Sequence, residues 1–442
     1  MTPSLSDLDA CFEGVIPSIV ATCDAAGVPN VSYLSHVVRL DDRHVALSNQ
    51  FFGKTARNVQ DNPRASILLV DARTGAQYAL AARYLRTVRD GPSFDRVAAA
   101  IRAGAAEGGK AAEMRLRGLD LYEVVDVVAV PSATLAEPTP PARRAAFADV
   151  EAIAVAVRDA ADVEAALDAL VDGLASRLAI PHVLLLLLDE TRDVLVTIAS
   201  RGFAAAGTSS EVPLGQGPIG VAAAERTAVR ISDLSRVRRF NRAVESGSAD
   251  EDRTRTVPLP TLPDVMSLVA VPVVARGRLH GVIYAESPAR LAFGSEEQAV
   301  LSLLAGQLAA SLSALEGLPD EPGLKSEPVP PARVGRRIAV VRHAYDDSVF
   351  IDGRYLVKGV PGRLLVHMLA IYLSEGRAEF TNRELRLAEA LKLPDVKDNL
   401  ETRLLLLRRR LIEKSAPIAL ERLGRGHLRL VVDGRPELDQ RG

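Results

Sequence analysis

The chain has 442 residues, of which 48% are hydrophobic and 25% charged, a composition typical of soluble globular proteins. This length suits about three domains, and no apolar run approaches the ~20 residues that a membrane span needs. The formal net charge is −2, yet residues 333–442 hold 22 Lys and Arg against 15 Asp and Glu, so the C-terminal part is basic and the rest acidic.

The N-terminus lacks the basic and apolar regions of a secretory signal, and we expect a cytoplasmic protein with no membrane partner. The two cysteines, Cys11 and Cys23, have no metal-ligand spacing and cannot build a disulfide framework. We therefore expect buried or free thiols and no metal site.

Residues 1–132 read as short strands joined by tight turns. The expected strands are IPSIVATC, PNVSYLSHVVRL, HVALSNQ, ASILLVD, AQYALAARYLRTV and LYEVVDVVAV. A short helix follows the third strand, and a second helix is expected near residues 93–106. This pattern predicts a small, mostly antiparallel barrel with helical insertions.

The stretch LSNQFFGKTARNVQDNP, residues 47–63, places Gly53, Lys54 and Thr55 at the start of the short helix. A P-loop needs a glycine five residues before Gly53, but Ser48 occupies that position, so the nucleotide-binding fingerprint fails. What remains is a lysine, a threonine hydroxyl and the free amides of a helix N-terminus. Together these groups can hold a single phosphate.

This stretch and the predicted barrel resemble the pyridoxamine-phosphate-oxidase-like split barrels, which commonly bind FMN, over about residues 10–131. The resemblance implies that the segment after the third strand clasps the FMN phosphate and that the YLSHV strand lies along the isoalloxazine ring. The residues implied to contact the cofactor are Ser35, His36, Val37, Ser48, Asn49, Lys54 and Thr55. In some relatives the position of His36 faces a haem. The domain ends at VAVPS, without the tail that binds pyridoxine phosphate in the oxidase proper, so we do not expect that chemistry.

Two proline-rich stretches interrupt the patterned sequence and predict linkers at residues 133–148 and 317–334. Between them, residues 149–316 open with the helix DVEAALDALVDGLASRLA and continue through several strands to a closing helix near residues 295–316. This order predicts an α+β domain with helices at both ends.

The middle domain contains LGQGPIG, in which Gly215, Gly217 and Gly220 fit the spacing of a dinucleotide-binding motif. The preceding strand is only about four residues long and the neighbouring strands form a meander, so we do not expect NAD. The same residues, with VRISDLS, SLVAVPVVARGRLHGVIYAES and FGSEEQAVLSLLAGQLAASL, resemble a GAF domain, a small-molecule sensor. The resemblance implies a pocket between the sheet and RRFNRAVESG, for a ligand that the sequence does not identify.

The closing helix repeats leucines at helical spacing, at Leu301, Leu304, Leu308, Leu312 and Leu315. Such a stripe can form a dimer seam or pack against the domain's own sheet. Because sensors of this kind are often dimeric, we expect a homodimer.

Residues 335–442 predict two short strands, three helices and a hairpin, the order of a winged helix. The segments GRLLVHMLAIYLSEGRAEFTNRELR, DNLETRLLLLRRRLIEK and LERLGRGHLRLVV resemble the OmpR/PhoB-type winged helix-turn-helix. The resemblance implies a third helix in the major groove of duplex DNA and a hairpin in the minor groove. The implied DNA contacts are Lys397, Asn399, Arg403, Arg408, Arg409, Arg410 and Arg425.

One departure from that family lies in the middle of the third helix, where Leu405 and Leu406 replace basic residues. These leucines remove phosphate contacts or bury a protein partner instead. The whole chain predicts a one-component sensory transcription regulator. An FMN-dependent oxidoreductase with regulatory domains, or a scaffold that has lost its ligands, is the alternative, and the sequence shows no set of catalytic residues.

Overall fold

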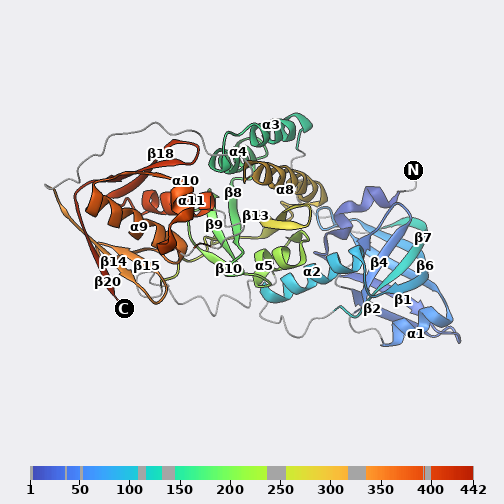
Figure 1. Ribbon diagram of the computed structural model, residues 1–442. Coiled ribbons are helices and arrows are strands. Elements are labelled where there is room, and N and C mark those ends of the chain that lie inside the picture. The colour runs from blue at the N-terminus through green and yellow to red at the C-terminus, as the bar shows by residue number, and fades with distance from the viewer. Residues whose placement is uncertain are drawn as a thin grey trace.

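The computed structural model describes residues 3–34, 37–49, 53–107, 116–131, 145–235, 255–316, 335–391, 393 and 400–441. Three parts follow one another along the molecule, with the N-terminal sheet and the C-terminal region on either side of the central part (Figure 1).

The N-terminal part is a curled, half-barrel sheet of seven strands in the order β2-β1-β5-β6-β7-β4-β3. Its elements are η1 (Leu5–Glu13), β1 (Ser18–Cys23), β2 (Pro29–Leu34), β3 (Val37–Arg39), β4 (His44–Asn49), α1 (Gly53–Asp61), β5 (Arg64–Val70), β6 (Gln77–Val88), α2 (Pro92–Glu107) and β7 (Gly118–Val130). Alternate residues of β1 and β5 are buried, so one face of the sheet encloses the core. The predicted split-barrel-like architecture is confirmed.

Helix α2 lies between this sheet and the central part, as Figure 1 shows. Val97 and Ile101 pack with residues of the N-terminal sheet, whereas Ala99 and Ala103 pack among residues of the central part. The small alanine side chains allow the close approach of α5. Each face of the helix therefore serves a different core.

The central part is a six-stranded antiparallel sheet in the order β10-β9-β8-β13-β12-β11. Its elements are α3 (Phe147–Arg158), α4 (Val163–Ser176), β8 (His182–Asp189), β9 (Val194–Arg201), β10 (Glu211–Pro213), α5 (Gly217–Glu225), β11 (Val229–Ile231), β12 (Ser267–Ala275), β13 (Arg278–Ser287) and α8 (Ser295–Glu316). Helices α3, α4 and α8 cover one face, and α5 with α2 covers the other. Because both faces are buried, β8 reads as the continuous apolar run HVLLLLLD.

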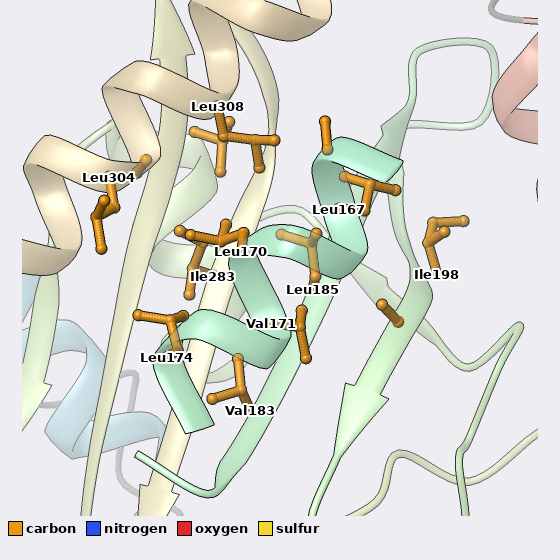
Figure 2. Close-up of a cluster of buried hydrophobic side chains, with 14 of the residues drawn as sticks. Leu167, Leu170, Val171, Leu174, Val183, Leu185, Ile198, Ile283, Leu304 and Leu308 are labelled. Carbon is orange, nitrogen blue, oxygen red and sulfur yellow. The ribbon is translucent and has the colours of Figure 1, made fainter. Parts of the chain in front are cut away.

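The leucine stripe of α8 packs into the core of the central part. Leu304 and Leu308 point toward Leu170 of α4 and Ile283 of β13 (Figure 2), and both leucines are 1% exposed or less. Of the two roles expected for the stripe, the dimer seam is wrong and packing against the domain's own sheet is confirmed. By length and composition α8 is also the one helix among the described residues that would suffice to cross a membrane, but this buried stripe makes it a core helix.

The glycine-rich turn before α5 has no βαβ context. Strand β10 has three residues and pairs antiparallel with β9. A Cβ atom at Gly220 would lie 2.3 Å from the backbone oxygen of Pro213, so glycine is required for the tight packing of the turn on the helix. Gly215 and Gly217 have positive φ angles of 78° and 59°, so the turn needs them for its backbone conformation. All three glycines therefore have a structural role.

The C-terminal region contains two small sheets and a set of helices. Its elements are β14 (Arg337–His343), β15 (Ser348–Ile351), β16 (Arg354–Val357), α9 (Val360–Glu375), β17 (Glu379–Thr381), α10 (Asn382–Leu387), η2 (Glu389–Leu391), α11 (Leu400–Glu413), β18 (Ile418–Gly424), β19 (His427–Val432) and β20 (Arg435–Arg441). One sheet has the order β16-β15-β14-β20 and the other β17-β19-β18. Strand β20, at the end of the chain, pairs parallel with β14.

Candidate functional site

The predicted phosphate site lies where β4 ends and α1 begins. Helix α1 starts at Gly53, and the Lys54 side chain is exposed and makes no ion pair within the described part of the chain. Thr55 is 2% exposed and faces β2. The lysine is therefore free to meet an incoming anion, while the threonine belongs to the wall behind it.

Three polar side chains form that wall. Asn30 Nδ2 donates a hydrogen bond to Thr55 Oγ1 at 2.9 Å, and the hydroxyls of Ser32 and Thr55 lie 3.0 Å apart. One of these hydroxyls donates to the other, so the second keeps a proton for another acceptor. With Lys54 and the amides at the start of α1, this arrangement fits a phosphate group.

The inner face of α1 is fixed to the sheet by polar contacts. Asn58 Nδ2 donates to Thr22 Oγ1 at 3.2 Å, and Asn62 Nδ2, just beyond the helix, donates to Cys23 Sγ at 3.0 Å. Together with Thr55, these residues recur at three- and four-residue spacing and so share one helix face. Thr55, which made the stretch resemble a P-loop, thus also helps to hold α1 against the sheet.

The predicted contacts on β3 and β4 are buried or bonded to other protein groups. Ser48 is 3% exposed, and Asn49 Nδ2 donates to Asp120 Oδ2 at 3.2 Å. Val37 is 3% exposed and packs in the barrel core, so only its backbone can reach a cofactor. Ser35 and His36 lie outside the described residues.

Asp120 lies in the barrel with its carboxylate screened from water. Thr87 Oγ1 donates to Asp120 Oδ1 at 2.6 Å and in turn lies 2.8 Å from the hydroxyl of Tyr84. Burial raises the pKa of Asp120 above its usual range, and the hydrogen bonds from Thr87 and Asn49 oppose that shift. Sequence reasoning missed this carboxylate because it occupies a single position in an apolar strand.

In the central part, a second buried carboxylate fastens a loop to the sheet. Glu286 on β13 is 2% exposed and accepts hydrogen bonds from Thr261 Oγ1, the backbone amide of Leu262 and the hydroxyl of Tyr284. Burial raises the pKa of Glu286. The predicted ligand pocket beside RRFNRAVESG falls outside the described residues.

The predicted DNA contacts that fall in the described residues lie on α11 and in the β18–β19 hairpin, and their side chains meet protein atoms. The side chains of Arg403, Arg408 and Arg409 all form ion pairs with the central part. Arg425 donates to the backbone oxygen of Leu315 at 3.5 Å. Lys397 and Asn399 lie outside the described residues.

Arg410 occupies a different environment from the other arginines of α11. Its side chain is 0% exposed, and its Nε donates to the backbone oxygen of Leu356 at 2.9 Å. The guanidinium also lies 3.3 Å from the Glu413 carboxylate. Its burial within the C-terminal region argues against a direct contact with a DNA phosphate.

Two family models match the chain. Residues 7–125 match the model described as pyridoxamine 5'-phosphate oxidase, and residues 162–312 match the GAF domain. Neither match reaches the C-terminal region. The chain therefore contains a pyridoxamine-phosphate-oxidase-like domain followed by a GAF domain, as the sequence predicted.

Solved structures resemble these two parts separately. The GAF domain from Acinetobacter phosphoenolpyruvate-protein phosphotransferase is 19% identical, with a TM-score of 0.33, over 39% of this chain and 96% of that chain. Free methionine-R-sulfoxide reductase from Neisseria meningitidis is 24% identical, with a TM-score of 0.30, over 38% and 87%. An FMN-binding protein from Syntrophomonas wolfei is 12% identical, with a TM-score of 0.24, over 29% and 86%. A search of the curated proteins finds no match.

Proposed function

We propose that the protein is a one-component sensory transcription regulator. Its domains are an FMN-binding split barrel at residues 1–132, a GAF sensor for a small molecule at 149–316 and a DNA-binding winged helix at 335–442, joined by linkers at 133–148 and 317–334. The proposal places it in the cytoplasm. The observation that carries the sensory half is the free Lys54 at the start of α1, in a domain that matches the pyridoxamine 5'-phosphate oxidase model.

FMN brings a dianionic phosphate and a ring that accepts and gives up electrons. Lys54, the α1 amides and the hydroxyl pair of Ser32 and Thr55 would hold the phosphate. The ring would then lie along the segment YLSHV, as the resemblance implies. Val31 and Tyr33 lie on the other face of β2 from Ser32 and are 62% and 74% exposed. Large exposed side chains on an edge strand favour a covering group, and a second copy of the chain would supply one.

Replacing Lys54 with alanine tests the cofactor assignment. A charge-assisted hydrogen bond contributes about 1.5–3 kcal/mol, so Lys54→Ala should weaken FMN binding by roughly 10- to 140-fold in a flavin fluorescence titration. Arg64→Ala, an exposed arginine at the start of β5, removes the same charge beyond the other end of α1 and should leave the affinity within about twofold. Equal affinities for wild type and Lys54→Ala would contradict the assignment.

The output half of the proposal rests on the order of elements in the C-terminal region. A sheet is followed by α9, α10, α11 and the β18–β19 hairpin, in a segment that is basic overall. Each DNA phosphate contact adds roughly 0.9 to the slope of log affinity against log salt concentration. Arg409→Ala and Arg425→Ala should therefore each lower that slope by about one, whereas Arg386→Ala on the exposed side of α10 should not. Salt-insensitive binding of duplex DNA would contradict the proposal that the C-terminal region is a DNA-binding output domain.

A further inference from the structure

Helix α11 is docked on the GAF domain, in contact with α4 and β9 (Figure 1). Leu405 and Leu406 are each 6% exposed and belong to the same buried cluster as the core residues of α3, α4 and α8. The two leucines that depart from the winged-helix pattern thus have a partner within the chain. They join the core of another domain.

The arginines on both sides of these leucines pair with acidic groups of the GAF domain. Arg408 pairs with Glu164, and Arg409 Nη2 lies 2.6 Å from Asp168 Oδ1, both partners being on α4. Arg409 Nη1 also donates to the backbone oxygen of Ile198 in β9 at 3.1 Å. The acidic side of α4 therefore presents oxygens to the two arginines proposed to contact DNA phosphates.

The contact extends beyond the middle of α11. Arg403 Nη2 lies 3.5 Å from Asp189 Oδ1, and Arg422 of the hairpin pairs with Asp162 at the start of α4. At a second place, Lys358 Nζ lies 3.0 Å from Glu211 Oε2. The helix and the hairpin are thus engaged together, along one side of the GAF domain.

We propose that the GAF domain occludes the DNA-binding surface of the C-terminal region, with the carboxylates of α4 in the places of DNA phosphates, so that DNA binds only when the two separate. This inference rests on the proposed DNA-binding function and adds its regulation. Because Arg403, Arg408 and Arg409 cannot contact α4 or its neighbours and a duplex together, the two states are mutually exclusive. A ligand that shifts the pairing of α4 with α11 therefore changes DNA affinity.

The contact between α11 and the GAF domain contains a cavity and partly exposed ion pairs, which suit a regulated contact. A cavity of about 70 Å³ lies between the start of α4, α11 and the hairpin, with Glu164, Arg408 and Arg422 in its wall. Arg408 and Arg422 keep about a third of their side-chain surface exposed. Partly hydrated ion pairs of this kind exchange readily and add little to stability, so they favour a reversible contact.

Charge reversal on the GAF side tests the proposal in the full-length protein without touching any residue proposed to bind DNA. In the double variant Glu164→Lys/Asp168→Lys, α4 repels Arg408 and Arg409. The variant should bind a random-sequence duplex at least about 30-fold more tightly than wild type, or about 2 kcal/mol at 1.4 kcal/mol per tenfold. Hydrogen exchange in α11 should rise in the absence of DNA.

Two added lysines also attract DNA directly, so a variant matched in charge is needed. Glu151→Lys/Asp264→Lys makes the same charge change on exposed GAF residues that form no ion pair with any other described residue, and it should raise affinity by less than about threefold. A gain equal to that of the α4 variant would overturn occlusion. So would unchanged protection of α11 in the α4 variant.

The wild type provides a second measurement that does not depend on the folding of a variant. Saturating duplex DNA should raise hydrogen exchange on α4, because the released arginines no longer cover it. Tight DNA binding with α4 and α11 still protected would overturn occlusion while leaving the DNA-binding function intact. Exposure of α11 in the α4 variant without any DNA binding would instead overturn the proposed function itself.

Discussion

Asp120 is a buried carboxyl group in the barrel whose surroundings change its pKa. Its carboxylate is 2% exposed and is held by the hydroxyl of Thr87 and the amide of Asn49. Burial raises the pKa of Asp120, so the folded state binds a proton more readily than the unfolded chain does. Between the ordinary value of 3.8 and the raised value, this group's contribution to stability falls as the pH rises.

Asp120→Asn removes that titration and keeps an oxygen for Thr87. The variant barrel should gain stability relative to wild type as the pH rises from below 3.8, with the gain constant once the wild-type carboxyl is fully ionised. Urea unfolding followed by tyrosine circular dichroism at several pH values measures this difference. Val125→Ala, at an exposed position of the same strand that carries no titratable group, should show no such trend. A difference that does not vary with pH would contradict the burial effect.

At the same scale, the sequence predicted part of the phosphate site and missed the rest. Lys54 and Thr55 stood out because a helix start is a local signal. Asn30 and Ser32 did not, because their contact with Thr55 joins residues 25 and 23 positions apart. Asn30 and Ser32 meet Thr55 only because β2 pairs with β1 and α1 packs against the sheet. Neither arrangement is encoded in a short motif.

At the scale of elements, strong periodicity predicted well and weak periodicity did not. The long helix α8 and the apolar strand β8 lie where the pattern placed them. Helix α3 was missed because alanine and valine dominate it and only Ile153 and Val157 are buried. Strand β20 was missed because its polar sequence forms a strand only by pairing with β14, about a hundred residues earlier.

The packing of α8 leads to a prediction about stability. Leu308 is 0% exposed beside Leu304 (Figure 2), whereas Leu303 on the opposite side of the helix is 66% exposed. Leu308→Ala should leave a cavity and cost about 2–5 kcal/mol, while Leu303→Ala should change stability by less than about 0.5 kcal/mol. Denaturant unfolding of the GAF domain measures both. Similar costs for the two variants would contradict the orientation of the helix.

At the scale of the whole molecule, the order of the domains was predictable and their contacts were not. Motifs identified the first two domains because each family repeats its own local pattern. The docking of α11 on the GAF domain depends on surfaces from two separate segments. The periodicity within either segment therefore does not predict this contact. Leu405 and Leu406 were the one visible sign, as apolar residues at positions where charge was expected.

These leucines should couple the unfolding of two domains. Each buries apolar surface at the boundary, and burial of a leucine contributes about 1.5–3 kcal/mol. The GAF domain and the C-terminal region should therefore melt together in the wild type, because loss of either exposes the surface of the other. This expectation holds whether or not the protein binds DNA.

In Leu405→Ala/Leu406→Ala, the shared apolar surface is lost and the ion pairs remain. Exposed or partly exposed ion pairs contribute only about 0–1 kcal/mol each, so they should not keep the two transitions together. Scanning calorimetry should show one joint transition in the wild type and two separate ones in the double variant. Leu387→Ala/Leu423→Ala removes two leucines of the C-terminal region that are 72% and 46% exposed and should keep the joint transition. Two separate transitions in the wild type would mean that the docking of α11 does not couple the unfolding of the two domains. This result would contradict the role assigned to Leu405 and Leu406.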